Sequence, residues 1–313
     1  MPHSTATISP HRNASAEPLN EADRKTLALL EETLCSIAVN SGAESRGRFA
    51  LAYSGGMDSR FLAHAAVLLG FQPFLLMAVS PQLPPEEENF GRIWAEKNGL
   101  KLRTVEVDPL SLPLVAMNDR RRCYECKRQI FGTFLRILNE ESAPLPLCDG
   151  TNASDALAYR PGTQAVLELG VHSPLALAGL SKADIYRLAA LSGMERPNQK
   201  PRPCLLTRLP YGMRPERKTL EGLAAAEQAV RLALEEAGIP EADFRLRLVP
   251  CAEGLSTELH LLRKDAQALP PGLLEDLTRL AENAAHQLPR PARLALQDSL
   301  SGFFDRLQPL TTS

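Results

Sequence analysis

The sequence has no apolar run that reaches the roughly 18 residues needed to cross a bilayer. Residues 1–19 are polar and contain proline, without the apolar stretch of a secretory signal, and we expect a disordered leader there. Charge of one sign is also scarce, because 35 Lys and Arg stand against 37 Asp and Glu. No overall field would therefore draw the protein to nucleic acid or to a membrane. These absences predict a cytoplasmic protein with no membrane or nucleic-acid partner.

The rest of the composition is that of an ordinary globular protein. Hydrophobic residues make up 44% of the 313 positions and charged residues 23%, enough for one large or two modest domains. Six cysteines are present. In a reducing compartment they indicate metal binding or catalysis and not a disulfide framework.

A glycine turn between a predicted strand and a predicted helix is the main landmark. Residues 49–53 are mostly apolar, two adjacent glycines follow, and residues 60–70 have helix-forming composition. A helix start presents unpaired N–H groups and a positive dipole end, and glycine lets an anion approach the backbone closely. The alternative is a turn that binds nothing. The expected phosphate ligands are Ser54, Gly55, Gly56 and Ser59, with Asp58 holding the Mg²⁺ of a nucleotide.

This turn lacks the Gly-Lys-Ser/Thr ending of the Walker loop. The six residues from Ser54 to Ser59 instead resemble the PP-loop of the ATP pyrophosphatase superfamily. Its members cleave ATP between the α and β phosphates and use the adenylate to activate a carboxyl or carbonyl carbon. The resemblance implies ATP and Mg²⁺ as cofactors. By analogy with PP-loop folds, Ala78 and Ser80 at the end of the second strand would frame adenine.

Strands and helices alternate through the first half of the chain. This order predicts an α/β fold, a doubly wound parallel sheet of the PP-loop, adenine nucleotide α hydrolase-like type, with a site at the carboxyl ends of its strands. A smaller C-terminal α+β domain follows, giving domains 20–195 and 196–313. The predicted helices are 21–39, 60–70, 85–98, 216–237 and 272–284, and the predicted strands are 49–53, 73–80, 102–107, 144–148, 244–248, 257–262 and 293–296.

Two cysteine segments stand out. Cys123 and Cys126 form a Cys-x-x-Cys pair, which suits a dithiol couple, half a zinc site or two ligands of an iron–sulfur cluster. Four neighbouring cations, residues 120–122 and 127, would lower the pKa of both thiols. Cys204 lies in a segment rich in proline and basic residues, 198–212, that is either an ordered loop with an anion site or a linker around a buried cysteine.

Arg245 and Arg247 alternate with apolar residues, which sends both to one face of a strand. Two guanidinium groups on one face form a clamp for phosphate or carboxylate, and a solvated polar face is the alternative.

Taken in order, these landmarks resemble the LarE-type ATP-dependent sulfur transferases, over residues 49–262. That family makes the nickel-pincer nucleotide cofactor of lactate racemase. The resemblance implies a substrate, pyridinium-3,5-biscarboxylic acid mononucleotide, whose carboxylate attacks the α-phosphorus of ATP, and a sulfur nucleophile that then displaces AMP. It also implies a homo-oligomer and sulfide or another sulfur donor. The matching segments are 54–59, 122–127, 149–155, 159–162, 173–175, 178–182, 203–212 and 245–247.

The family has two branches. In one, a cysteine matching Cys204 forms a thioester and is consumed, leaving dehydroalanine. In the other, three cysteines hold a 4Fe–4S cluster that carries a sulfide on its open iron. Because Cys123, Cys126 and Cys204 are all present, we expect the cluster branch. Other roles that the resemblance implies are a catalytic acidic residue at Glu227, or alternatively Glu221, an ATP or metal site at Thr151 and Asp155, and a substrate site at Arg208, Arg245 and Arg247.

Three other functions compete. A PP-loop tRNA-thiolating enzyme also uses three cysteines, but it needs a basic groove, which a net charge of −2 does not favour. An amidating synthetase of the same superfamily would not need the cysteines. A non-catalytic nucleotide-binding module would release no pyrophosphate.

Overall fold

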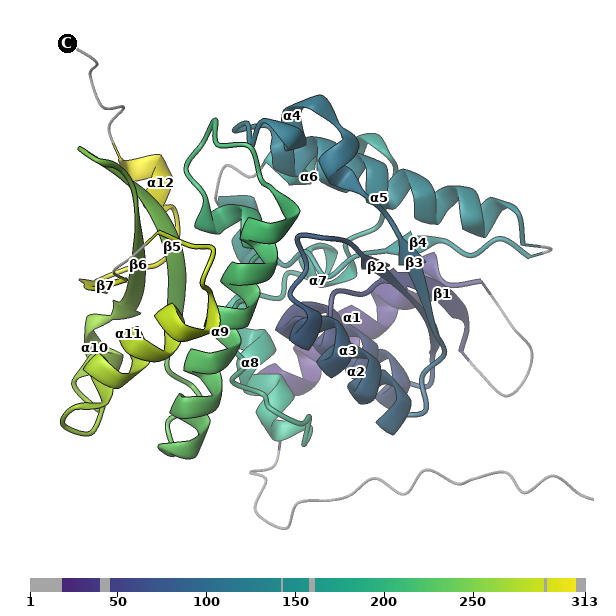
Figure 1. The fold of residues 1–313 in the computed structure, drawn as a ribbon. Helices are drawn as coiled ribbons and strands as arrows, with labels where there is room; N and C mark the ends of the chain where they lie inside the picture. Colours follow the sequence, from purple (N-terminus) through teal and green to yellow (C-terminus); the bar gives the residue numbers. More distant parts are fainter. Residues whose placement is uncertain (1–18, 40–45, 142, 158–160, 290–291, 308–313) are drawn as a thin grey trace, which may run out of the picture.

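The computed structural model describes residues 19–39, 46–141, 143–157, 161–289 and 292–307 (Figure 1). Almost all of the predicted leader lies outside these ranges, as do Tyr159 and Arg160 of one matching segment. Within the described ranges, no helix is both long enough and apolar enough to cross a membrane.

The first sheet has four parallel strands in the order β3-β2-β1-β4. The chain moves outward from β1 to β3 and then returns to the other side of β1, so the strand order reverses at β1. Ligands of open α/β sheets bind at such a switch point, outside the carboxyl ends of the strands. The strands are β1 (Arg48–Ala52), β2 (Gln72–Val79), β3 (Leu102–Glu106) and β4 (Leu147–Cys148).

Helices cover both faces of this sheet, which confirms the predicted doubly wound α/β fold (Figure 1). Phe49 and Leu51 pack on one side against α1, α2, α3 and α8, whereas Ala50 and Leu76 pack on the other side against α5 and α6. The helices are α1 (Glu21–Ile37), α2 (Met57–Leu68), α3 (Pro85–Lys97), α4 (Pro113–Ala116), α5 (Arg122–Asn139), α6 (Pro161–Glu168), α7 (Pro174–Leu177) and α8 (Lys182–Leu191).

The predicted smaller C-terminal α+β part is also confirmed. Its sheet has the order β5-β6-β7, with β5 and β6 antiparallel and β6 and β7 parallel. α9 and α11 pack on one face of it through a separate core that includes Leu223, Val230, Leu246 and Leu277. Its elements are α9 (Arg217–Glu236), β5 (Phe244–Cys251), β6 (Gly254–Leu262), α10 (Arg263–Ala266), α11 (Leu273–Ala284), β7 (Arg293–Gln297) and α12 (Phe303–Arg306).

Several elements near the site, α8 among them, differ from the predicted ones. β4 has two residues where five were predicted, because Pro144 and Pro146 have no N–H to donate to a neighbouring strand. α5 was not predicted at all, yet it carries Cys123 and Cys126. These residues are three apart on a helix and therefore lie on the same side of it.

Candidate active site

The PP-loop segment folds as a tight turn between β1 and α2. Gly55 has φ 72°, and a Cβ there would lie 3.2 Å from Cα of Gly91, so a side chain would meet backbone. Gly56 precedes the first turn of α2. The Ser59 hydroxyl accepts from the Ser54 amide at 3.3 Å and donates to the Gly56 carbonyl at 3.2 Å. The turn therefore leaves the start of α2 turned toward the carboxyl end of β1.

A cavity of about 460 Å³ lies at this point. It brings together residues from the PP-loop, from the end of β2 and from the segment after β4, and two cysteines line it as well. Nearly every residue predicted to bind ATP thus faces one cavity; Gly55 is the exception, because it turns toward α3. The predicted residues that line it are Ser54, Gly56, Asp58, Ser59, Ala78, Ser80, Cys126, Thr151, Asp155 and Cys204.

Lys182 is a site residue that the sequence analysis missed. Its Nζ lies 2.6 Å from both carboxylate oxygens of Asp58, and its side chain lines the cavity. It is the first residue of α8, where Ser181 and Asp184 form a capping box that fixes the helix start. The lysine adds a positive charge beside the PP-loop. Its only signal in the sequence is its place at the end of the matching segment 178–182.

The cysteine segments meet at the cavity from two directions. Cys126 comes from the second turn of α5, and Cys204 immediately precedes the short 3₁₀ turn Leu205–Arg208. Gln82 connects them, since its side-chain amide donates to Sγ of Cys126 at 3.5 Å and its carbonyl accepts from the Leu205 amide at 2.9 Å. Cys123, one helical turn before Cys126, does not line the cavity.

Burial, followed by the neighbouring Cys204 and Cys123 thiols, raises the pKa of Cys126 to about 12. Burial and the Cys204 thiol also raise the pKa of Cys123, although that residue has more exposed surface. The expectation that nearby cations lower both pKa values is therefore wrong. Arg122 and Lys127 act in that direction on Cys123, but loss of water around the sulfur outweighs them.

In metal-free protein, iodoacetamide should consequently modify Cys126 at pH 8 about a hundredfold or more slower than in the urea-unfolded chain, because the thiolate is the reactive form. Peptide mapping by mass spectrometry measures both rates. Cys35, which is exposed on α1, serves as the internal control and should react at similar rates in the two states. Equal rates for native and unfolded Cys126 would contradict the burial of its sulfur.

Among the residues described, no group of three or more His, Cys, Asp or Glu side chains is arranged to hold a metal ion. The Cys204 thiol is nonetheless close enough to the Cys-x-x-Cys pair to raise the pKa of both Cys123 and Cys126. Cys148 and Cys251 stay outside the site: the first is buried at the end of β4, and the second ends β5 at a hairpin turn.

Arg208 and Glu227 form a buried ion pair and do not face the cavity. The guanidinium donates to both carboxylate oxygens, at 2.9 and 2.8 Å, and the two residues are 2% and 6% exposed. Arg208 also donates to the Pro203 carbonyl at 2.7 Å and to the Cys204 carbonyl at 3.3 Å. Burial alone would raise the pKa of Glu227, but Arg208 outweighs burial and lowers it. An ionised, paired carboxylate is a poor proton donor, so the geometry favours a positioning role for both residues, and the catalytic role of Glu227 and the substrate contact of Arg208 stay predictions.

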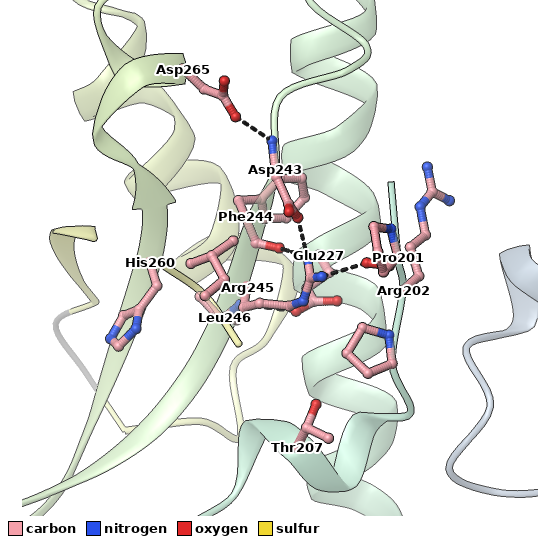
Figure 2. A network of polar contacts seen from close by, with 12 residues as sticks. Pro201, Arg202, Thr207, Glu227, Asp243, Phe244, Arg245, Leu246, His260 and Asp265 are labelled. Carbon is pink, nitrogen blue, oxygen red and sulfur yellow. Dashed lines mark hydrogen bonds and ion pairs between the residues drawn. The ribbon is translucent and has the colours of Figure 1, made fainter. Parts of the chain in front are cut away.

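Arg245 and Arg247 lie on one face of β5, and both are buried, which excludes the solvated alternative. Arg245 donates to Asp243 and to the Pro201 carbonyl, and Glu227 lies beside it, where it accepts from the Leu246 amide (Figure 2). Neither arginine lines the cavity. In this conformation neither is open to a phosphate, because protein groups already contact both guanidinium groups.

No family model matches the chain. It is 35% identical over 185 residues to an uncharacterised protein of Synechocystis sp., slr1717, covering 59% of this chain and 69% of that protein. It is 27% identical over 186 residues to the pyridinium-3,5-bisthiocarboxylic acid mononucleotide synthase of Lactiplantibacillus plantarum, covering 59% and 67%.

Among solved structures, NMN synthetase from Francisella tularensis overlaps with a TM-score of 0.45 at 16% identity, covering 58% of this chain and 76% of that one. The doubly wound α/β fold follows from the strand order of the first sheet and not from this overlap. The extent and identity of the sequence matches decide the relationship. The chain belongs to the same family as slr1717 of Synechocystis, and it is a distant homologue of the Lactiplantibacillus synthase.

Proposed function

We propose that the protein is an ATP-dependent sulfur transferase that converts a carboxylate of pyridinium-3,5-biscarboxylic acid mononucleotide into a thiocarboxylate. One observation carries the proposal: Cys126 and Cys204 face the same cavity as the PP-loop. A superfamily member that activates a carboxylate needs a nucleotide site, and one that transfers sulfur also needs a thiol within reach of it. The homology to the synthase, at 27% identity, supports the choice of substrate.

In this proposal ATP occupies the cavity with its adenine by Ala78 and Ser80 and its phosphates at the start of α2. The substrate carboxylate attacks the α-phosphorus, the α–β bond breaks, and pyrophosphate leaves. The α2 amides and Lys182 stabilise the negative charge that gathers on the leaving group. Carboxylate and hydroxyl oxygens of Asp58, Asp155 and Thr151 line the same cavity and suit Mg²⁺, which when bound neutralises phosphate charge.

The sulfur step uses the cysteine side of the cavity. Arg208 donates to the Pro203 and Cys204 carbonyls and so restrains the loop that carries Cys204. In this proposal that loop brings the sulfur to the acyl-adenylate. The three thiols of Cys123, Cys126 and Cys204 match the soft donor set of a 4Fe–4S cluster with one open iron. Such a cluster, when bound, would supply the sulfide. The sacrificial use of Cys204 is the alternative.

The test is an anaerobic reaction of purified protein with ATP, Mg²⁺, sulfide and the pyridinium substrate. Mass spectrometry should find a thiocarboxylate, together with AMP and pyrophosphate in equal amounts. Repeated turnover with intact Cys204 supports the cluster, whereas one product per chain with dehydroalanine at Cys204 supports sacrifice. AMP and pyrophosphate without any sulfur-containing product would overturn the proposal.

Replacing Lys182 by methionine should lower kcat/KM for ATP about a hundredfold, because one charge that stabilises the departing pyrophosphate is lost. Pyrophosphate release measured against ATP concentration gives this value. Lys97, which pairs with Glu195 at the surface, provides the matched control, and Lys97→Met should leave kcat/KM unchanged. An unchanged value for Lys182→Met would remove the lysine from the ATP site.

A further inference from the structure

The charged face of the C-terminal sheet is covered by a short segment of the same chain. The register of β5 and β6 places Arg245, Arg247, Glu258 and His260 on one face, opposite the apolar core. The short helix α12 lies alongside these strands (Figure 1). Its Phe303 ring meets the His260 ring edge-on at 4.4 Å and lies 4.9 Å from the Arg247 guanidinium.

Arg247 is a buried cation with no carboxylate of the described residues at ion-pair distance; Glu258, opposite it on β6, reaches it only through His260, whose Nε2 lies 2.7 Å from that carboxylate. It is 3% exposed, and its donors reach only neutral groups, His260 Nδ1 at 2.8 Å and the Leu300 carbonyl at 2.5 Å. Its Nε has no hydrogen-bond partner among the described residues, nor does any described carboxylate pair with it. Burial, followed by Arg245 and Arg208, lowers its pKa to about 9. A buried charge is ordinarily paired, so this environment is that of a binding site whose counter-ion comes from elsewhere.

A second group of cations lies next to α12, around its Asp305 carboxylate. Arg120 and Arg122 each stack on the Tyr211 ring, at 4.6 and 4.7 Å. Arg122 is 6% exposed, and its Nε likewise has no partner among the described residues. The Asp305 carboxylate enters this group, accepting from the Tyr211 hydroxyl at 2.7 Å and lying 3.5 Å from Arg120.

α12 thus places one aromatic ring and one carboxylate among five basic or aromatic side chains, Arg120, Arg122, Tyr211, Arg247 and His260. The place adjoins the thiols, since Asp305 is among the charges that act on the Cys123 sulfur. A ring that carries a carboxylate is also what the proposed pyridinium substrate would present, and its phosphate would supply the missing anion. The Phe303 ring and the Asp305 carboxylate, with the cations around them, therefore match the groups of an aromatic carboxylate that carries a phosphate.

We propose that α12 is a built-in competitor of the nucleotide substrate: Phe303 and Asp305 occupy a site for an aromatic carboxylate with a phosphate, formed by Arg120, Arg122, Arg247 and His260. This inference depends on the proposed function for the identity of the substrate. α12 must leave before the substrate binds, so the apparent dissociation constant equals the intrinsic one divided by the fraction of time for which α12 is displaced.

Binding of nicotinic acid mononucleotide, a pyridinium carboxylate with a 5′-phosphate, tests the inference without any catalytic step. Titration calorimetry on the full chain without ATP should give a dissociation constant about tenfold lower for Phe303→Ala and for Asp305→Asn than for the unaltered protein. Asp298→Asn is the matched control: Asp298 pairs with Arg263 at the surface, and this change should leave binding as it is. Adding Arg247→Met to either variant should abolish the gain.

Two results overturn the inference. Unchanged affinity in both variants would mean that α12 does not compete, and weaker affinity would mean that α12 is part of the site and not its occupant. Failure of the proposed function is seen separately. If no thiocarboxylate forms but the variants bind the mononucleotide more tightly, α12 is a competitor and the proposed reaction is wrong. If thiocarboxylate forms and the variants bind the mononucleotide as the unaltered protein does, the proposed reaction is supported and α12 is not a competitor.

Discussion

Replacing Cys204 by serine is expected to abolish thiocarboxylate formation, by on the order of 10⁴-fold or more, while ATP is still cleaved to AMP and pyrophosphate. In the proposed reaction the two steps use different residues of the cavity. The α2 amides, Asp58 and Lys182 would serve the adenylate, whereas Cys204 lines the same cavity from the loop before the turn Leu205–Arg208. A serine oxygen neither binds iron as a thiolate does nor delivers sulfur.

Pyrophosphate release and thiocarboxylate mass spectrometry follow the two steps separately in the same sample. Cys251→Ser is the control, because Cys251 ends β5 at the hairpin turn and does not line the cavity. It should leave both steps unchanged. If Cys204→Ser still forms thiocarboxylate at the full rate, Cys204 takes no part in the reaction. The reason for placing the sulfur step at this cavity would then be lost.

The same assay on Cys123→Ser and Cys126→Ser separates the two forms of sulfur delivery. If three thiols hold a cluster, each replacement removes a ligand, and sulfur transfer should fall as far as in Cys204→Ser. If Cys204 alone is consumed, both variants should still make about one product per chain. The result therefore identifies the branch even where the cluster is too labile for iron analysis.

The PP-loop side of the candidate site could be predicted because its signals are local. A strand, two glycines and a helix follow within about 20 residues, and the expected phosphate cradle needs that backbone alone. The parallel sheet then brings Ala78, Ser80, Thr151 and Asp155 to the same edge, because the carboxyl ends of parallel strands meet there. The predicted sheet therefore indicated that these residues lie close together in space, although they are far apart in the sequence.

The remainder of the site depends on contacts between distant segments. α5 has polar residues at most positions of its first turns, so its hydrophobic period becomes clear only further along the helix. Lys182 reaches Asp58 across 124 positions of sequence. Alternation correctly placed Arg245 and Arg247 on one face of β5, but it could not reveal that α12 covers that face. The partners of a buried charge are a property of the packed fold.

Glu227 was predicted to be catalytic, but in the structure it is paired with Arg208 in the interior. Its replacement is expected to have a large effect on stability. Glu227→Ala should lower the free energy of unfolding by about 3–5 kcal/mol, because it leaves Arg208 as a buried charge without its counter-ion. It also removes the acceptor of the Leu246 amide on β5. Denaturant titration measures the loss.

Because the pKa of Glu227 is lowered in the fold, the stability it contributes is present above about pH 4.5, its ordinary value, and is lost as the pH falls through the folded pKa.

Two further variants separate positioning from catalysis. Glu221→Gln changes an exposed residue of the same helix, and it should alter neither stability nor sulfur transfer. The double variant Arg208→Met with Glu227→Leu removes both charges, so most of the stability should return. Sulfur transfer should nevertheless stay low in the double variant, because the Pro203 and Cys204 carbonyls have lost the guanidinium that fixes the loop. A stable double variant with full sulfur transfer would show that the ion pair stabilises the fold without positioning Cys204. A fully stable Glu227→Ala chain with no sulfur transfer would instead indicate that Glu227 takes part in the reaction.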